Sequence, residues 1–237
     1  IGAAAVDPGA TRNDASADKA VMERIRFLAA SLAQRRQDDR EIARFFVTAL
    51  QLLHFNRIDG DVIEFGCERF RQVPLAWRAI RSQRTQRQIW AMGSFEPLPT
   101  AKTARDLHPS WQAGTATISE GMFRRRCRLA GLPTQACHLS RIDLTALDAT
   151  ITEPSRIALA SISCQQFSAV RAVLRWLEPK LSNGMILAFE HYFCFSRFDR
   201  SGARHGLEEL KMLRPDLNFI PYRTFAQAGQ SFVVEDA

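Results

Sequence analysis

The sequence predicts an α/β fold built on one open, mostly parallel sheet. Over most of the chain, short apolar runs that end in Gly, Pro or polar residues alternate with segments of helical periodicity. Near the carboxyl end, two strand-like runs are separated by a short turn, as in an antiparallel pair. The chain has 237 residues, 46% hydrophobic and 24% charged, which suits a globular protein with a full core.

The amino-terminal part predicts helices before any strand. Residues 1–16 are small and polar, and we expect them to form a flexible segment. Apolar residues then recur at helical spacing over Ala17–Gln37 and again over Asp38–His54. We therefore expect two helices, the second of which is capped by Asp38 or Asp39.

The rest of the chain predicts the sheet. We expect a single domain over 17–237, with helices in 17–56 and a sheet core in 60–235. The last two strands are expected to form a hairpin around Ala226–Gly229. The expected strands are Asp61–Gly66, Gln88–Gly93, Gln135–Leu139, Arg156–Ser163, Gly184–Glu190, Asn218–Tyr222 and Gln230–Val234. The helices expected between them are Pro74–Arg81, Ser119–Gly131, Phe167–Leu177 and Ala203–Leu213.

Ligands of open α/β sheets bind at the carboxyl ends of the strands, so residues there are the first candidates for a site. The candidates at these ends are Glu64, Gly66, Gly93, Ser94, His138, Ser163, Gln165, Glu190 and His191. The segment Glu96–Gly114 holds prolines and polar residues and predicts a long loop. Long loops over such sheets often cover ligands, and we expect this one to do so.

Charge and composition restrict the class of protein. The formal net charge is +7, and only four of the 32 Lys and Arg residues are lysines. Arginine clusters at 81–87 and 124–128 are interpreted as solvated helix faces rather than as a nucleic-acid site. Five widely spaced cysteines predict free thiols, without zinc. No apolar run is long enough to cross a bilayer and no secretion signal is visible, so we expect a cytoplasmic protein without a membrane partner.

Motifs at four strand ends share one pattern. The chain reads GDVIEFGCERFRQ over 60–72, GSFEPLP over 93–99, SCQQFS over 163–168 and EHY over 190–192. In this order the motifs resemble those of the macrocin O-methyltransferase family, metal-dependent sugar O-methyltransferases that use S-adenosylmethionine (SAM). The similarity runs from about Gly60 to Val234, which is most of the chain.

The resemblance implies a fold, a cofactor and partners. The fold is the Rossmann-like class I methyltransferase fold, with a mostly parallel seven-stranded sheet, helices on both faces and an antiparallel C-terminal strand pair. The cofactor is SAM, and the partners are a small-molecule acceptor with a hydroxyl group and a second copy in a homodimer.

The motifs also depart from the family. Phe70 replaces a glycine beside the methionine part of SAM, so that a ring there is expected to crowd the cofactor. Gly93 replaces the acid that holds the ribose hydroxyls. In place of the family's metal ligands and base, this chain has Ser163, Gln165, Glu190 and His191. Hard cations need several carboxylate oxygens, and only Glu190 offers them, so we expect no metal site.

The resemblance nominates Glu64, Gly66, Cys67, Ser94, Phe95 and Ser163 for cofactor binding. The alternatives are structural roles. Glu64 would then accept hydrogen bonds from loop amides, and Phe95 would be a core residue. His191 is the candidate general base, because its ordinary pKa lies near neutrality. Glu190 joins it as a catalytic candidate and would orient His191 only if the strand has ended. The alternative is that His191 has no task.

Three functions remain open from the sequence. The first is a SAM-dependent, metal-independent O-methyltransferase that acts on a hydroxyl of a sugar or natural product. The second is a catalytically inactive methyltransferase-fold protein, a pseudoenzyme that serves as a binding or assembly partner. The third is a nucleic-acid or phospho-ligand binder that uses the arginine clusters, whose affinity would fall steeply with salt.

Overall fold

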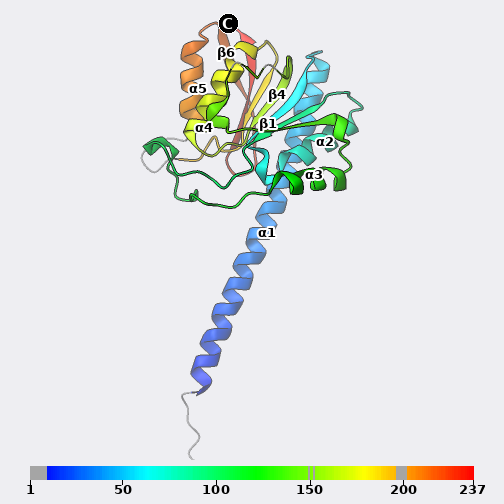
Figure 1. Cartoon of the computed structure of the whole chain (residues 1–237). Helices are drawn as coiled ribbons and strands as arrows, with labels where there is room; N and C mark the ends of the chain where they lie inside the picture. The colour runs from blue at the N-terminus through cyan, green and yellow to red at the C-terminus, as the bar shows by residue number, and fades with distance from the viewer. Residues whose placement is uncertain (1–9, 149, 152, 196–201) are drawn as a thin grey trace, which may run out of the picture.

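The structure is a computed structural model that describes residues 10–148, 150–151, 153–195 and 202–237. A seven-stranded sheet lies between two layers of helices, and one long helix, α1 (Ala10–Phe55), extends well beyond these layers (Figure 1). Among the described residues, no helix combines the length and the apolar character that a membrane span needs.

The sheet has the strand order β3-β2-β1-β4-β5-β7-β6. Strands β1 to β5 are parallel, and β7 pairs antiparallel with both β5 and β6. The strands are β1 (Asp61–Phe65), β2 (Ile89–Gly93), β3 (Cys137–Arg141), β4 (Ile157–Ile162), β5 (Ile186–Phe189), β6 (Leu217–Phe225) and β7 (Gly229–Asp236). The predicted class I methyltransferase fold, with its antiparallel C-terminal pair, is thereby confirmed.

Helices cover both faces of the sheet. One face packs against α1, α2 (Gln72–Ser82) and α3 (Glu120–Leu129), and the other packs against α4 (Phe167–Leu177) and α5 (Gly202–Leu213). Successive side chains of β1 alternate between these layers, so that Val62 lies in the first core and Ile63 in the second. The described residues also contain five short 3₁₀ turns: Cys67–Arg69, Ala104–Asp106, Thr134–Ala136, Leu144–Ala146 and Glu178–Lys180.

The prediction of two amino-terminal helices was wrong. Helix α1 is continuous, and it begins at Ala10, inside the segment 1–16 that we expected to be flexible; residues 1–9 lie outside the described residues. The helix contains no Gly or Pro that would interrupt its hydrogen bonds. Asp38 and Asp39 do not cap a helix, because both carboxylates pair with the guanidinium of Arg71.

The third strand begins two residues later than predicted. Residues Thr134–Ala136 form a 3₁₀ turn after Pro133, so β3 runs from Cys137 to Arg141 rather than over Gln135–Leu139. His138 therefore lies within the strand instead of at its end, and its ring stacks on Trp90 with 4.1 Å between the centroids. The helix predicted from Ser119 is confirmed, with the Ser119 side chain accepting a hydrogen bond from the amide of Met122.

Candidate functional site

A pocket opens at the carboxyl ends of β1, β2, β3 and β4, where the loops after these strands meet. Its wall consists of Gly66, Arg69, Ser94, Glu96, Leu98, Pro99, Thr115, Ala116, Thr117, Asp143, Leu144, Thr145, Ser163, Cys164, Gln165, Gln166 and Ala169. Parallel strands bring their carboxyl ends to one edge of the sheet, which is why residues about 100 positions apart converge here.

The loop after β1 forms one side of the pocket. Gly66 has φ of +84°, and a Cβ at this position would lie 3.0 Å from the amide nitrogen of Cys164, so only glycine fits between β1 and β4. Phe70 also lies in the left-handed region, with φ of 49°. Its ring packs edge-on against Phe123, with 5.0 Å between the centroids, and it does not line the pocket. Arg69, rather than Phe70, forms this part of the wall.

Three of the six residues nominated for cofactor binding line the pocket: Gly66, Ser94 and Ser163. The other three do not. The carboxylate of Glu64 is buried and accepts a hydrogen bond from the Ser163 hydroxyl at 3.3 Å, a side-chain donor rather than the loop amides of the structural alternative. Cys67 and Phe95 lie in the core beneath α1 and α2, because the turn after β1 and the ring contact with Phe123 direct them inward.

Some groups in the wall of the pocket have the chemistry to match groups of SAM. SAM presents a planar base, ribose hydroxyls, an amino group and a carboxylate. Arg69 offers a cation, Asp143 offers a carboxylate, and Leu144 and Pro99 offer apolar surface. Gly93 provides no acid at the end of β2, as the sequence showed, but Glu96 on the same loop carries a carboxylate and pairs with Arg141.

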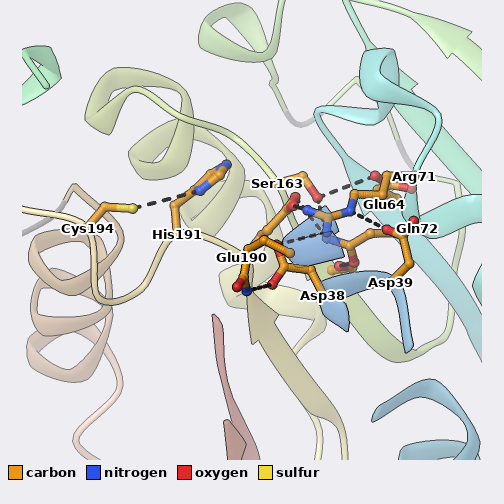
Figure 2. Close-up of polar contacts among 11 residues, drawn as sticks. Asp38, Asp39, Glu64, Arg71, Gln72, Ser163, Glu190, His191 and Cys194 are labelled. Carbon is orange, nitrogen blue, oxygen red and sulfur yellow. Dashed lines mark hydrogen bonds and ion pairs between the residues drawn. The ribbon is translucent and has the colours of Figure 1, made fainter. Parts of the chain in front are cut away.

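Beside the pocket, the carboxylate of Glu190 is buried in a network of hydrogen bonds (Figure 2). Its Oε1 accepts a hydrogen bond from Nη1 of Arg71 at 3.1 Å, and its Oε2 accepts one from Nε2 of Gln72 at 3.1 Å. The same Gln72 amide donates to Ser163 at 2.8 Å, and its oxygen accepts from the Ser161 hydroxyl. The network ties β4 and the end of β5 to the start of α2.

Arg71 connects this network to α1. Its guanidinium lies 2.8 Å from a carboxylate oxygen of Asp39 and 3.3 Å from one of Asp38, in addition to its contact with Glu190. Burial raises the pKa of Glu190. The protonated form of His191, the charges of Arg71 and Arg69 and the hydrogen bond from Gln72 outweigh burial and lower the pKa overall. Glu190 is therefore ionised at neutral pH.

The residues at this edge do not fit a divalent cation. Both oxygens of Glu190 already accept hydrogen bonds, and Ser163, Gln165 and His191 contribute no carboxylate. Across the described ranges, no group of three or more His, Cys, Asp or Glu side chains could hold a metal ion. Mg²⁺ needs several carboxylate or water oxygens. The positive charge of Arg71, which already pairs with Glu190, would repel such a cation from this position.

His191 follows directly after Glu190, on the other side of the cluster from Arg71 (Figure 2). Its Nδ1 lies 3.9 Å from the sulfur of Cys194, and its ring meets Trp111 edge-on at 5.5 Å between centroids. Its Nε2 is buried and has no hydrogen-bond partner among the described residues. Glu190 does not orient the ring, since its carboxylate is held by Arg71 and Gln72.

The electrostatic surroundings keep His191 neutral. Burial lowers its pKa most, and the positive charges of Arg69, His108 and Arg71 lower it further, while Glu190 acts in the opposite direction. A neutral imidazole is the form that can accept a proton. His191 does not line the pocket itself and lies beneath Trp111 of the long loop.

The long loop between β2 and α3 is held against the pocket by Asp106. One oxygen of the buried Asp106 accepts a hydrogen bond from the Ser168 amide, in the first turn of α4, at 2.8 Å; the other accepts from the Thr103 and Lys102 amides. Gln166 also donates to the carbonyl of Pro99 at 2.8 Å. The loop therefore supplies part of the wall.

Sequence reasoning missed several residues of this region, among them Arg71, Gln72, Asp106 and Asp143. Asp143 could have been found, since it follows the end of β3, but the strand was placed two residues too early. Asp106 carried a local signal, because Thr103 and Asp106 form a reciprocal capping box. Arg71 and Gln72 carried none, because their partner Glu190 is more than 100 residues away.

Comparisons with known proteins place the fold. No protein-family model matches the sequence, and no curated protein matches it. Solved structures do match: the O-methyltransferase NovP has a TM-score of 0.64 at 17% identity, over 82% of this chain and 79% of that chain. CalS11, a calicheamicin methyltransferase, has a TM-score of 0.61 at 19% identity, over 81% of this chain and 77% of that chain.

A second structure of CalS11, described as a TDP-rhamnose 3'-O-methyltransferase, has a TM-score of 0.50 at 19% identity, over 78% of both chains. At these identities the likeness establishes the fold. It confirms that the resemblance drawn from the strand-end motifs was correct at this level.

Proposed function

We propose that this chain is a SAM-dependent, metal-independent O-methyltransferase that acts on a hydroxyl of a sugar or natural product. The observation that carries the proposal is the open pocket at the ends of β1 to β4, whose wall includes Gly66, Arg69 and Asp143. The fold that forms this pocket is similar to those of NovP and CalS11. Phe70, the residue that most threatened cofactor binding, does not line this pocket.

The roles of the residues follow from their chemistry. When bound, SAM supplies a methyl group already activated on a sulfonium, so the protein must align the acceptor oxygen and remove its proton. His191 accepts that proton at Nε2, the buried nitrogen without a partner among the described residues. Glu190 remains charged and stabilises the imidazolium that forms. No step requires a metal ion.

The acceptor class rests on the relatives and on the loop. CalS11 is described as acting on TDP-rhamnose, and NovP as an O-methyltransferase, so sugar hydroxyls are the first substrates to test. The aromatic pair His108 and Trp111, stacked at 4.3 Å, stands over His191 and offers a flat apolar surface on which a sugar ring can lie.

The first experiment is calorimetric titration with S-adenosylhomocysteine, for which the loop offers matched variants. Ala116 lines the pocket, whereas Ala113, which is also exposed and lies on the same loop, does not. We expect the wild type and Ala113→Trp to bind the ligand alike, and Ala116→Trp to bind it at least tenfold more weakly. Wild-type protein that shows no heat at saturating ligand would refute the proposal.

The second experiment measures turnover. Purified protein is incubated with SAM and a panel of nucleotide sugars and phenolic glycosides, and formation of S-adenosylhomocysteine is followed. Product that depends on an acceptor supports the enzyme. Binding without product for any acceptor would favour the second candidate.

The second candidate is a catalytically inactive methyltransferase-fold protein that binds a ligand or a partner. The closed network favours it, because Arg71 and Gln72 occupy both oxygens of Glu190 and leave no carboxylate for chemistry at that edge.

A nucleic-acid binder has less support. Arg87 of the first arginine cluster donates to the backbone carbonyls of Ile58 and Gly60, and Arg124 of the second pairs with Glu120 at 2.8 Å. Both contacts are intramolecular. The second cluster lies on helix α3, as interpreted from the sequence, whereas α2 ends at Ser82, so that Arg84 and Arg87 of the first cluster lie beyond the helix.

A further inference from the structure

The amino-terminal half of α1 projects away from the sheet and its helices (Figure 1). Large apolar side chains on this part of the helix are 51–71% exposed: Val21, Met22, Ile25, Phe27, Leu28 and Leu32. Exposed apolar groups in such a row are uncommon on a monomer and indicate a surface that is covered by a partner.

Four of these residues form a seam with the spacing of a coiled coil. Val21, Ile25, Leu28 and Leu32 follow one another at intervals of four, three and four residues. The same spacing continues through Arg35 and Asp39 into the other half of α1. There the seam positions are buried against the chain's own core: Ile42, Phe46, Ala49 and Leu53. One continuous seam is thus covered in its second half and uncovered in its first.

We propose that the uncovered half of this seam, residues 18–35, pairs with the same segment of a second copy as an antiparallel two-stranded coiled coil. Asp18 and Arg35 occupy the seam positions at the two ends of the apolar stretch. An antiparallel pair places each Asp18 position opposite the Arg35 position of the second copy, at both ends.

The apolar positions match in the same alignment. Val21 lies opposite Leu32 of the second copy, and Ile25 lies opposite Leu28. A parallel pair would instead place Asp18 opposite Asp18 and Arg35 opposite Arg35, and like charges at facing seam positions destabilise a coiled coil.

The position of the folded body favours the same orientation. From Ile42 onward, the seam is covered by the chain's own core. In a parallel pair, the folded sheet and helices of each copy would lie where the helix of the other copy must continue along the seam. In an antiparallel pair, they lie at opposite ends of the paired segment.

The segment is short but already ordered. Eighteen helical residues span about 27 Å, roughly two and a half heptads, which is marginal for an isolated peptide. Here the helix is continuous with a half that is anchored in the core, so association does not require the cost of nucleating it. We therefore expect a reversible dimer with a dissociation constant on the order of micromolar.

The mass of the full chain in solution tests the pairing. Sedimentation or light scattering from about 1 to 300 μM should show the mass rise from 26.8 kDa to twice that value. The double variant Ile25→Asp, Leu28→Asp should weaken association by about a hundredfold or more, because it buries carboxylates in the seam. Phe27→Asp is the matched control: Phe27 is 71% exposed but lies off the seam, so this variant should still dimerise.

These substitutions lie outside the part of the chain that packs around the sheet. The far-ultraviolet circular dichroism spectra, and hence the secondary-structure content, should therefore be the same for all variants. A wild-type chain that stays at 26.8 kDa throughout would overturn the proposal. So would a monomer that binds anionic phosphatidylglycerol vesicles, which would assign the apolar face to a lipid surface. Loss of the dimer in Phe27→Asp but not in the seam variant would also refute it.

Cysteine cross-linking tests the orientation. In an antiparallel pair, the double variant Val21→Cys, Leu32→Cys should form disulfide-linked dimers under mild oxidation, whereas Val21→Cys alone should not exceed the background of the wild type. Efficient cross-linking of Val21→Cys alone would show a parallel pair and overturn the proposed arrangement.

Discussion

Arg71 and Glu190 form an ion pair, with 3.1 Å between Nη1 and Oε1, at the strand end where the family resemblance implied metal ligands. The guanidinium supplies the positive charge at this edge. It also fixes α1 to the sheet, because the same group pairs with Asp38 and Asp39. At this edge of the sheet, these contacts join α1, the start of α2 and the end of β5.

Removal of Arg71 should be costly because it leaves Glu190 buried without its cation. We expect Arg71→Met to lower the free energy of unfolding by about 3–5 kcal/mol, as measured by urea unfolding at pH 7. The double variant Arg71→Met, Glu190→Gln should recover much of this loss, since it removes both charges. Two losses that simply add would contradict the coupling that the geometry shows.

The same pair makes stability depend on pH. The pKa of Glu190 is lower in the folded chain than its ordinary value of 4.5, so the folded state binds fewer protons than the unfolded state just below that value. Its contribution is fully present above about pH 4.5 and is lost as the pH falls through the folded pKa.

Between pH 7 and pH 3, the free energy of unfolding of the wild type should therefore decrease more steeply than that of Glu190→Gln. The difference in slope approaches about 1.4 kcal/mol per pH unit for one proton. Glu235→Gln, at the exposed end of β7, is the control and should follow the wild type. Parallel curves for Glu190→Gln and the wild type would contradict the lowered pKa.

At position 70, glycine should give a more stable protein than alanine, which is the reverse of the usual order. Its φ of 49° and ψ of 48° belong to the left-handed region, which glycine adopts without strain and alanine does not. Both variants lose the ring contact with Phe123, but Phe70→Gly should be more stable than Phe70→Ala by about 1 kcal/mol in urea unfolding.

Met212 supplies the control for this comparison. It is exposed near the end of α5, and at a helical position the order is expected to reverse, with alanine more stable than glycine. If Phe70→Ala were more stable than Phe70→Gly as well, the left-handed backbone conformation at position 70 would not determine the stability of these variants.

The fold was predictable because its signals are local. The helix Phe167–Leu177 has the predicted bounds, and the apolar runs of β1 and β4 were visible without any partner. The continuous α1 was not predicted, because Asp38 and Asp39 were interpreted as caps while their actual partner, Arg71, lies in a different element.

The site was predictable in position but only partly in composition. The strand ends gave Gly66, Ser94, Ser163 and Gln165 of the pocket wall. Contacts between distant residues, such as Glu190 with Gln72, depend on where the chain turns and left no periodic or compositional trace. The direction of a side chain at a turn, as for Cys67, was likewise set by backbone geometry that the sequence does not display.

His191 is the residue on which the enzymatic proposal depends most. If it accepts the proton of the acceptor hydroxyl, His191→Gln should reduce kcat by about 10²–10⁴-fold. Binding of S-adenosylhomocysteine should be unchanged, since His191 does not line the pocket. His138→Gln is the control, because that histidine stacks on Trp90 within β3 and should leave turnover intact.

The pH profile separates this role from a structural one. Burial and the neighbouring positive charges place the pKa of His191 below 6.5, so the reactive neutral form predominates from pH 8 down to pH 6.5. The wild-type kcat/KM should be flat over this range and fall about tenfold per pH unit once the pH drops below the pKa of His191. This decrease should disappear in His191→Gln. A variant that keeps both full turnover and the acid decrease would show that another group takes the proton.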